Sequence, residues 1–259
     1  MSTGHEFMLH RNNIPFTFHL LCLLLVVLPV MLGSTPIGRC QDSSFGATVS
    51  VHELKIPQKA RESLEKGVQR LNAGDPRGSE PFFRKAIEKF PGYYEAYYEL
   101  GLAQARLGQN NQASHSFQSA IDLSEGNFPL AEFAYGLFLC DQGNVKDAER
   151  LVRRGLDQDQ NIPDGFVALG VVMLYRHQPA EAAHNAQEAL SRNSRLATAY
   201  LVLAEADHQR NNYSAEIQHL TAYLNLEPKG PRSEFARDLR NTAERLASGS
   251  ANQVVNNHN

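Results

Sequence analysis

The stretch that decides the fold runs from Tyr97 to Glu125 and reads YYELGLAQARLGQNNQASHSFQSAIDLSE. In its first half, apolar side chains recur at helical spacing, at Tyr97, Leu100, Ala103 and Leu107. In its second half the same spacing recurs at Ala113, Phe117, Ala120 and Ile121. Residues at this spacing share one face of an α-helix, and Gly108 lies between the two runs. The stretch therefore predicts a helix, a short turn and a second helix.

The same unit recurs along the chain at a nearly constant step. Successive small residues lie 34, 35, 34 and 34 positions apart, at Gly67, Gly101, Gly136, Gly170 and Ala204. A turn column keeps the same steps, at Gly74, Gly108, Gly143, His177 and Asn211. An apolar column does so too, at Phe83, Phe117, Val152, Ala186 and Leu220. The small column lets paired helices cross closely. The turn column predicts a left-handed residue where Gly or Asn stands, and His177 is its least suited member.

These columns resemble the tetratricopeptide repeat family, whose period is 34 residues. The second unit carries the family's signature residues, at Tyr97, Leu100, Gly101, Ala113, Phe117 and Ala120. The resemblance covers about residues 60–228 and implies an all-α fold, a right-handed superhelical solenoid of antiparallel helix pairs. We expect five repeats, at 60–93, 94–128, 129–162, 163–196 and 197–228. A capping helix at 229–247 and a disordered tail at 248–259 should follow.

The third unit departs from the repeat pattern. Glu132 replaces its aromatic residue, and Gly155 weakens its second helix. The 35-residue step that precedes this unit requires one extra residue near 126–128.

The first unit departs in another way, because it contains two prolines close together. Asp75 and Pro76 are typical of a helix start, but Pro81 would then lie deep enough for its ring to clash with a carbonyl one turn back. We therefore expect the second helix of this unit to begin at Ser79.

The N-terminal region predicts export. Residues 14–32 read IPFTFHLLCLLLVVLPVML and contain no charge. A spanning helix needs about 20 apolar residues and a secretory apolar region roughly 7 to 15, so the run suits either a cleaved signal peptide or a retained membrane anchor. Cleavage is favoured by Pro29 and by the small residues Gly33, Ser34 and Gly38. Residues 1–40 are thus assigned to export. Lipid attachment at Cys40 is a weaker alternative, because Arg39 precedes it.

Residues 41–59 form a lead between the export segment and the repeats. Within this lead, residues 47–57 read ATVSVHELKIP and alternate apolar with polar side chains, which is typical of an extended segment half buried against something. An all-helical protein has no sheet to receive such a segment. Either the lead lies along the groove or the first repeat of its own chain, or it serves only as a tether.

Charge and motifs exclude several classes of function. The chain has 25 Lys and Arg against 28 Asp and Glu, so it carries no basic excess for nucleic acid. Its sequence contains no Cys-x-x-Cys, no glycine-rich phosphate loop and no Gly-x-Ser-x-Gly motif, and Glu181 with His184 is only half of a helical metal site. We therefore expect no enzyme activity, no cofactor and no metal, and membrane contact only through the N-terminal segment.

The resemblance implies that the first helices of the repeats line a concave groove. Three positions of each first helix share the face that would form it, namely those three before, one after and four after the small column. They are Leu64, Val68 and Leu71; Tyr98, Leu102 and Ala105; Phe133, Leu137 and Cys140; Val167, Val171 and Leu174; and Leu201, Glu205 and His208. This groove stripe is apolar until its last unit. The alternative is that much of it only packs helix against helix.

The groove stripe bears on the choice of ligand. Family members that hold acidic C-terminal tails use Lys, Arg and Asn on this face, and aliphatic or aromatic residues mostly stand there in this chain. We therefore expect an exported, noncatalytic interaction module or assembly scaffold that binds a partner segment in an apolar groove. The alternative is a membrane-anchored structural adaptor of a cell-envelope complex, with its repeats outside the cytoplasm.

N-terminal sequencing of the protein isolated from its native source separates these two hypotheses. We expect a mature chain that starts between roughly 34 and 42, because the small residues before a signal-peptidase site lie there. An intact N-terminus would instead support the anchored adaptor.

Overall fold

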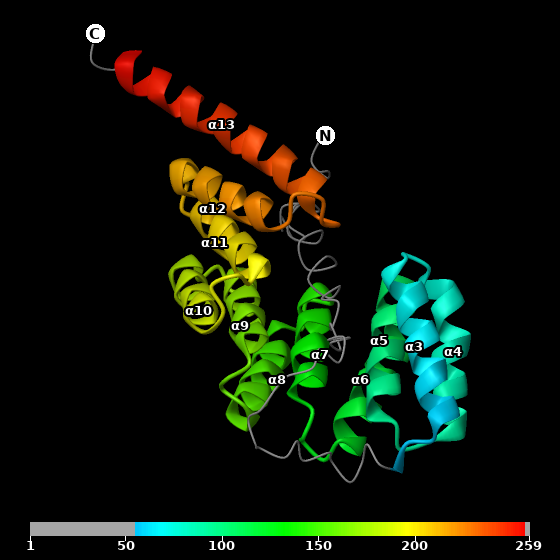
Figure 1. The fold of residues 1–259 in the computed structure, drawn as a ribbon. Coiled ribbons are helices and arrows are strands. Elements are labelled where there is room, and N and C mark those ends of the chain that lie inside the picture. The colour runs from blue at the N-terminus through cyan, green and yellow to red at the C-terminus, as the bar shows by residue number, and fades with distance from the viewer. Residues whose placement is uncertain (1–54, 257–259) are drawn as a thin grey trace, which may run out of the picture.

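The computed structural model describes residues 55–256, and the side chains of residues 55–248. Residues 55–256 contain eleven helices and no strand (Figure 1). The export segment expected at 1–40, including Cys40, lies outside the described residues, and so does most of the lead expected at 41–59.

Ten of these helices form five hairpins, and one helix follows them. The first helices of the pairs are α3 (Gln58–Asn72), α5 (Tyr94–Arg106), α7 (Pro129–Asp141), α9 (Pro163–Tyr175) and α11 (Ala197–Gln209). Their partners are α4 (Pro76–Lys89), α6 (Asn110–Leu123), α8 (Val145–Gln158), α10 (Pro179–Arg192) and α12 (Tyr213–Leu226). The last helix is α13 (Ser233–Asn256). The all-α solenoid predicted from the sequence is confirmed.

The helices form two layers, which follow from the order of their contacts. Each first helix packs against its own partner, and the first helices α3, α5, α7, α9 and α11 also contact one another in sequence. Each second helix contacts the first helix of the next pair. The first helices therefore form a continuous wall, which we call the inner face, and the pairs stack along one curved axis (Figure 1).

The turn inside each pair is the same in all five units. The residue of the turn column has a positive φ in every unit, at Gly74 (79°), Gly108 (70°), Gly143 (80°), His177 (56°) and Asn211 (58°). Each turn also closes two backbone bonds; in the second unit Gly108 N donates to Ala105 O at 3.1 Å and Gln109 N to Gln104 O at 2.9 Å. This is the Schellman arrangement of a helix end, and it confirms the predicted left-handed column, His177 included.

The small column lies directly against the apolar column. A Cβ atom added at Gly67 would lie 2.4 Å from Phe83 Cε1, and one at Gly101 would lie 2.8 Å from Phe117 Cδ1. At Gly136 it would lie 2.6 Å from Val152 Cγ2. Since Phe83 and Phe117 are fully buried, the absence of a side chain at the glycine is what allows the two helices to come together.

The expected start of α4 at Ser79 is wrong. The helix begins at Pro76 and runs regularly through Pro81. Asp75 caps it by accepting a bond from Gly78 N at 2.8 Å. Pro76 is the first helical residue, where an N–H group would have no acceptor within the helix, so its missing donor costs the helix nothing. Pro81 is exposed, so the carbonyl that loses its helical donor lies toward water and can be hydrated.

The two departures in the third unit compensate for each other. Glu132 is buried, and its carboxylate accepts bonds from Arg154 Nε at 2.5 Å and Gln158 Nε2 at 2.6 Å. A Cβ atom at Gly155 would lie 3.0 Å from Glu132 Oε2 and 2.6 Å from Phe133 Cε1. Gly155 therefore makes room on α8 for the carboxylate that replaces the aromatic ring.

The extra residue of the 35-residue step lies between α6 and α7. The connection 124–128 is one residue longer than the connections 90–93, 159–162 and 193–196. This longer connection contains two successive residues in the left-handed conformation, Glu125 with φ 51° and Gly126 with φ 79°. The helix pairs keep their own geometry as a result.

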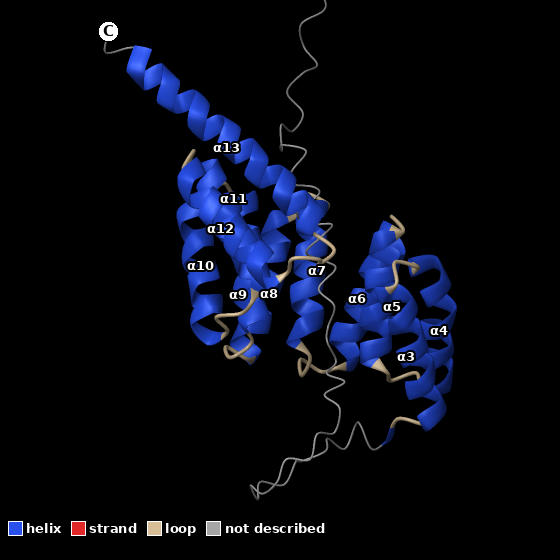
Figure 2. Cartoon of the chain, turned by 45° about the horizontal axis from the view of Figure 1, so that its top comes forward, coloured by secondary structure: helices blue, strands red, loops and turns tan. Residues whose placement is uncertain are grey.

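The C-terminal helix is longer than expected. A capping helix was expected at 229–247 and a disordered tail after it, but α13 continues to Asn256 and so corrects that boundary. Gly249 is the one glycine of this segment and no proline follows it, which is too weak a signal to end a helix. The end of α13 runs beyond α12 (Figure 2).

The beginning of the described chain is packed against the first repeat. Ile56 is 5% exposed and belongs to the hydrophobic core. Pro57 follows it, and its carbonyl accepts bonds from Ala60 N at 2.9 Å and Arg61 N at 3.2 Å. The end of the lead is therefore part of the folded domain.

The close approach of the small and apolar columns can be tested at Gly101. We expect Gly101→Ala to lower the free energy of unfolding by about 1–3 kcal/mol, because the new methyl group collides with the fully buried Phe117. Chemical denaturation measures this change. Ala204→Gly is the matched control, since α11 already holds a methyl group at that column, and it should cost only about 1 kcal/mol of helix propensity. Equal stability of Gly101→Ala and the wild type would contradict the explanation.

Candidate binding surfaces

Most residues of the groove stripe are buried. Twelve of the fifteen are no more than 7% exposed, and the partly exposed ones are Val68, Ala105 and His208. The buried residues include Leu64, Tyr98, Leu102, Phe133, Leu137, Val167, Val171, Leu201 and Glu205. The structure therefore brings the stripe together along the inner face, but mainly as part of the hydrophobic core.

Two aromatic residues show why the stripe is buried. The Tyr98 ring makes T-shaped contacts with Phe117 at 6.5 Å and with Phe128 at 5.3 Å between ring centroids. A Cβ atom at Gly165, on the first turn of α9, would lie 2.5 Å from Phe133 Cζ. These large rings fill the space between successive pairs, so they hold the units together.

Polar side chains beside the stripe were not predicted as site residues. Glu99 follows Tyr98 on α5 and is 4% exposed. Burial raises its pKa to about 7, and the positive charge of Arg106 opposes this rise. Arg106 Nη1 donates to Leu71 O of α3 at 2.8 Å. Asp164, in the first turn of α9, also has a raised pKa because of burial. A signal was present in the sequence for two of them, because Glu99 and Arg106 directly follow the stripe residues Tyr98 and Ala105.

The last unit carries a second polar group on the inner face. His208 Nδ1 lies 3.0 Å from Glu216 Oε2, and that bond raises the His208 pKa. Burial raises the pKa of Glu205 to about 7, against the opposing charge of His208. His219 Nδ1 lies 2.9 Å from Asp207 Oδ2. The expected polar end of the stripe is thus an acid and histidine network that joins α11 to α12.

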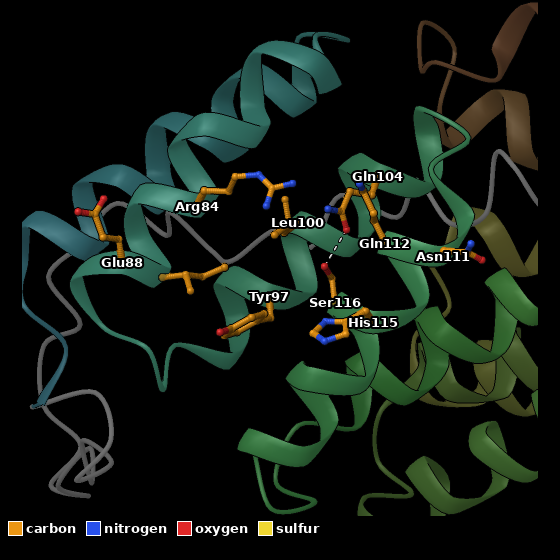
Figure 3. Close-up of a pocket in the computed structure, with 10 residues that line it drawn as sticks. Arg84, Glu88, Tyr97, Leu100, Gln104, Asn111, Gln112, His115 and Ser116 are labelled. Carbon is orange, nitrogen blue, oxygen red and sulfur yellow. Dashed lines mark hydrogen bonds between the residues drawn. The ribbon is translucent and has the colours of Figure 1, made fainter.

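A notch lies between α4 and α6 over α5, on the second-helix layer (Figure 3). Its volume is about 690 Å³, and its lining includes Ile87, Tyr97 and Leu100 together with the polar side chains Arg84, Glu88, Gln104, Asn111, Gln112, His115 and Ser116. Gln104 is nearly fully buried and accepts a bond from Ser116 Oγ at 2.7 Å. The notch therefore offers both charged and neutral hydrogen-bonding groups, and one of them, Gln104, is already bonded to Ser116.

The described residues offer no site for metal chemistry. In residues 55–256, no three His, Cys, Asp or Glu side chains come together in a way that could hold a metal ion. None of the helices in that range is both long enough and apolar enough to cross a membrane. Cys140 is a buried free thiol.

Comparisons with known proteins agree with the repeat architecture. Two models of the tetratricopeptide repeat match this chain, over residues 82–113 and 167–233. Anaphase-promoting complex subunit 3 of Schizosaccharomyces pombe is 26% identical over 153 residues, which make up 58% of this chain and 23% of that protein. The chain thus spans about a quarter of the length of this curated relative.

Solved structures share the fold. The APC/C hetero-tetramer Cut9-Hcn1 superposes with a TM-score of 0.60 at 23% identity, over 67% of this chain and 35% of that chain. A thermophilic TPR protein of Thermus thermophilus gives a TM-score of 0.63 at 16% identity, over 73% of this chain and 98% of the other. Pseudomonas aeruginosa pilF gives 0.57 at 20% identity, over 78% and 98%. The chain thus contains tetratricopeptide repeats within residues 82–113 and 167–233, and its described helices share the fold of these structures.

The buried carboxyl group of Glu205 predicts a pH dependence of stability. In the folded state the pKa of Glu205 is about 7, above the ordinary value of 4.5. Between these two pH values the folded state therefore keeps a proton that the unfolded state releases. The free energy of unfolding consequently falls as the pH rises from about 4.5 to 7. Glu205→Gln removes this penalty. We expect the variant to be more stable than the wild type at pH 8, by up to about 3 kcal/mol, and the difference to vanish toward pH 4.5. Thermal unfolding across this pH range measures it.

The matched control is Glu65→Gln, at an exposed position of α3, which should not change the pH profile. A stability gain of Glu205→Gln that is the same at pH 5 and pH 8 would show that ionisation is not its cause.

Proposed function

We propose that this tetratricopeptide-repeat protein is an exported scaffold that binds a polypeptide segment of a partner protein along its inner face. The repeats point to a protein–protein interaction scaffold, and proteins built from them are generally noncatalytic interaction modules. The observation that carries the finer proposal is the continuous inner wall formed by α3, α5, α7, α9 and α11. Such a wall can contact an elongated ligand at several repeats at once.

The exposed part of the inner face sets the kind of contact that this segment would make. The large rings of the stripe are buried, so the partly exposed Val68, Ala105 and His208 are left to meet a ligand, with the flanking Arg106 and Gln209. Two of these five residues are apolar and three can form hydrogen bonds. We infer that the small apolar contacts align the bound segment and that the polar side chains determine which segment binds.

The export segment at 14–32 supports a place outside the cytoplasm, with cleavage preferred and a retained anchor as the alternative. If the segment is retained, the same inner face would serve a membrane-anchored adaptor of an envelope complex. By their printed names, the fission yeast relative is a subunit of a complex and one structural neighbour is part of a hetero-tetramer. These likenesses support a role of this chain within a protein assembly.

The inner face can be tested by cross-linking and capture from the native envelope with the full chain. Val68→Glu and Ala105→Glu together place two charges on partly exposed positions of α3 and α5. We expect this double variant to lose a specific cross-linked partner by about tenfold or more, because a desolvated charge at a contact opposes binding. Quantitative mass spectrometry measures the recovery.

Ala183→Glu is the matched control, because Ala183 is equally half-buried but lies on α10 of the second-helix layer. It should retain the partner, and circular dichroism should show all variants folded. Equal recovery with the double variant and the control would overturn binding on the inner face.

A further inference from the structure

Two contacts between a histidine and a carboxylate join the helices of the fifth pair. His208 of α11 lies with its Nδ1 3.0 Å from Glu216 Oε2 of α12. In the opposite direction, His219 of α12 lies with its Nδ1 2.9 Å from Asp207 Oδ2 of α11. Because an ionised carboxylate only accepts, the ring nitrogen is the donor in both contacts. When the histidines are protonated, α11 and α12 are therefore joined twice by groups of opposite charge.

The acids of these contacts are buried, and the histidines are partly open to water. The side chains of Glu216 and Asp207 are 4% and 9% exposed, whereas those of His208 and His219 are 36% and 29% exposed. Water can therefore reach each imidazole and exchange its proton while the carboxylate stays inside. A histidine that loses its proton can still donate through Nδ1, but the buried carboxylate then loses that counter-charge. A buried charge left in this way opposes the packing of the two helices.

One of the two contacts has a neutral counterpart in another repeat. Asp207 and His219 stand 3 and 15 positions after Ala204 of the small column. In the second repeat the same two positions are Gln104 and Ser116, and Ser116 Oγ donates to Gln104 Oε1 at 2.7 Å. That contact joins the helices of its pair in the same place, but it does not titrate near neutral pH. The other repeats have Arg70 and Phe82, Leu139 and Leu151, and Met173 and Asn185 there.

A second set of positions shows the same contrast. His208 and Glu216 stand 4 and 12 positions after Ala204, and Glu205, which is 7% exposed, directly follows it. The equivalent side chains of the second and fourth repeats are apolar. They are Leu102, Ala105 and Ala113 in the second repeat and Val171, Leu174 and Ala182 in the fourth. The fifth pair thus has titratable groups where these repeats have apolar ones, so its closure depends on pH where theirs depends on packing.

The titration of His208 and that of Glu205 act in the same direction. The bond to Glu216 raises the pKa of His208 above the ordinary value of 6.5, against the effect of burial, and the charge of Glu205 adds to the rise. His208 therefore stabilises the folded pair fully below pH 6.5, and this contribution is lost as the pH rises through its folded pKa. Burial raises the pKa of Glu205 to about 7, so its ionisation also opposes the folded pair as the pH rises.

The neighbouring elements bring other polar groups to these contacts. Arg210, at the end of α11, lies 3.9 Å from Asp207 Oδ1, but its side chain is half exposed, so water largely screens its charge. Helix α9 reaches the pair through the Leu174 carbonyl, 3.5 Å from Gln209 Nε2. The other titratable neighbours are Tyr213 beside His208, Tyr200 beside His219, Tyr223 of α12 with Arg232 of α13, and Glu188 of α10, which is bonded to Arg192 and lies near His184. The two imidazoles, with Glu205, are thus the groups at these contacts whose charge changes near neutral pH.

We propose that the fifth helix pair is a pH-sensitive clasp, which the protonated His208 and His219 hold closed on Glu216 and Asp207 and which opens locally when they lose their protons. Helix α11 is the last helix of the inner wall, and α12 carries the cap α13 (Figure 1). An open clasp would therefore shorten the inner face and release the cap. This inference goes beyond the proposed function, because it holds whether or not the inner face binds a partner.

Hydrogen–deuterium exchange of the full chain tests the clasp helix by helix. Glu205→Gln is the background for all measurements, because it removes the titration of that carboxyl and leaves that of the histidines. Between pH 6 and 8, we expect the protection factors of α11 and α12, which correct for the intrinsic exchange rate, to fall about three- to tenfold. Those of α3 and α4 should stay constant over the same range.

Two double variants assign the effect by copying contacts from other repeats. Asp207→Gln with His219→Ser introduces the neutral pair of the second repeat, and His208→Leu with Glu216→Ala introduces the apolar pair of the fourth. Each should reduce the pH dependence of α11 and α12, and the two together should abolish it. His115→Gln, at an exposed histidine of α6, is the matched control and should leave that dependence unchanged.

A titration of the histidine ring signals by NMR needs none of the four clasp substitutions. In the Glu205→Gln chain, the midpoint for His208 should coincide with the midpoint at which α11 and α12 lose protection, because one proton controls both. This measurement decides the question if circular dichroism shows that a double variant does not fold.

Three results would overturn the clasp. They are the same pH dependence of protection in α11 and α12 as in α3 and α4, an unchanged dependence in the folded combined variant, and a His208 midpoint that differs from the midpoint of exchange. Failure here is distinct from failure of the proposed function. Capture by the inner face is measured with Val68→Glu and Ala105→Glu, which lie on α3 and α5.

Discussion

The whole structure depends on the contact between a residue without a side chain on one helix and a large apolar residue on the next. Gly67 against Phe83 and Gly101 against Phe117 leave no room for even one methyl group. This contact fixes how closely each pair crosses and therefore the direction in which its helices emerge. The contact recurs in the third pair, where Gly136 lies against Val152, whereas Gly170 lies against Val202 of the next pair. A small residue keeps its place at steps of 34 or 35 residues, so each pair stacks on the next in a similar way.

The same constraint explains how the third repeat tolerates a charge in its core. Glu132 stands where the pattern calls for an aromatic ring, and a buried carboxylate without partners would be costly. The glycine at 155 lets that carboxylate lie against α8, where Arg154 and Gln158 donate to it. Glu132 and Gly155 are therefore a matched pair, in which a buried carboxylate and the space beside it replace the usual aromatic contact.

The sequence predicted the features that the 34-residue period controls. It failed at one local helix start, and it failed where the packing of one repeat against the next determines burial. The turn column was predictable because a helix end of this type needs a positive φ, and even His177 adopts it. The start of α4 was not, because the cap at Asp75 outweighs the cost of the exposed Pro81. The groove stripe has the correct helical phase. Its burial depends on how far rings such as Tyr98 and Phe133 reach between neighbouring pairs, which a repeat pattern does not reveal.

The burial of the apolar stripe changes where specificity must come from. Residues that pack one repeat against the next cannot also contact a ligand, because exposing them would separate the repeats. What remains on the inner face is a polar minority, and one buried member of it, Glu99, has an electrostatic cost in the folded chain, because burial raises its pKa to about 7. Contacts that distinguish one ligand from another on this face must therefore come from its partly exposed side chains, such as Arg106 and His208.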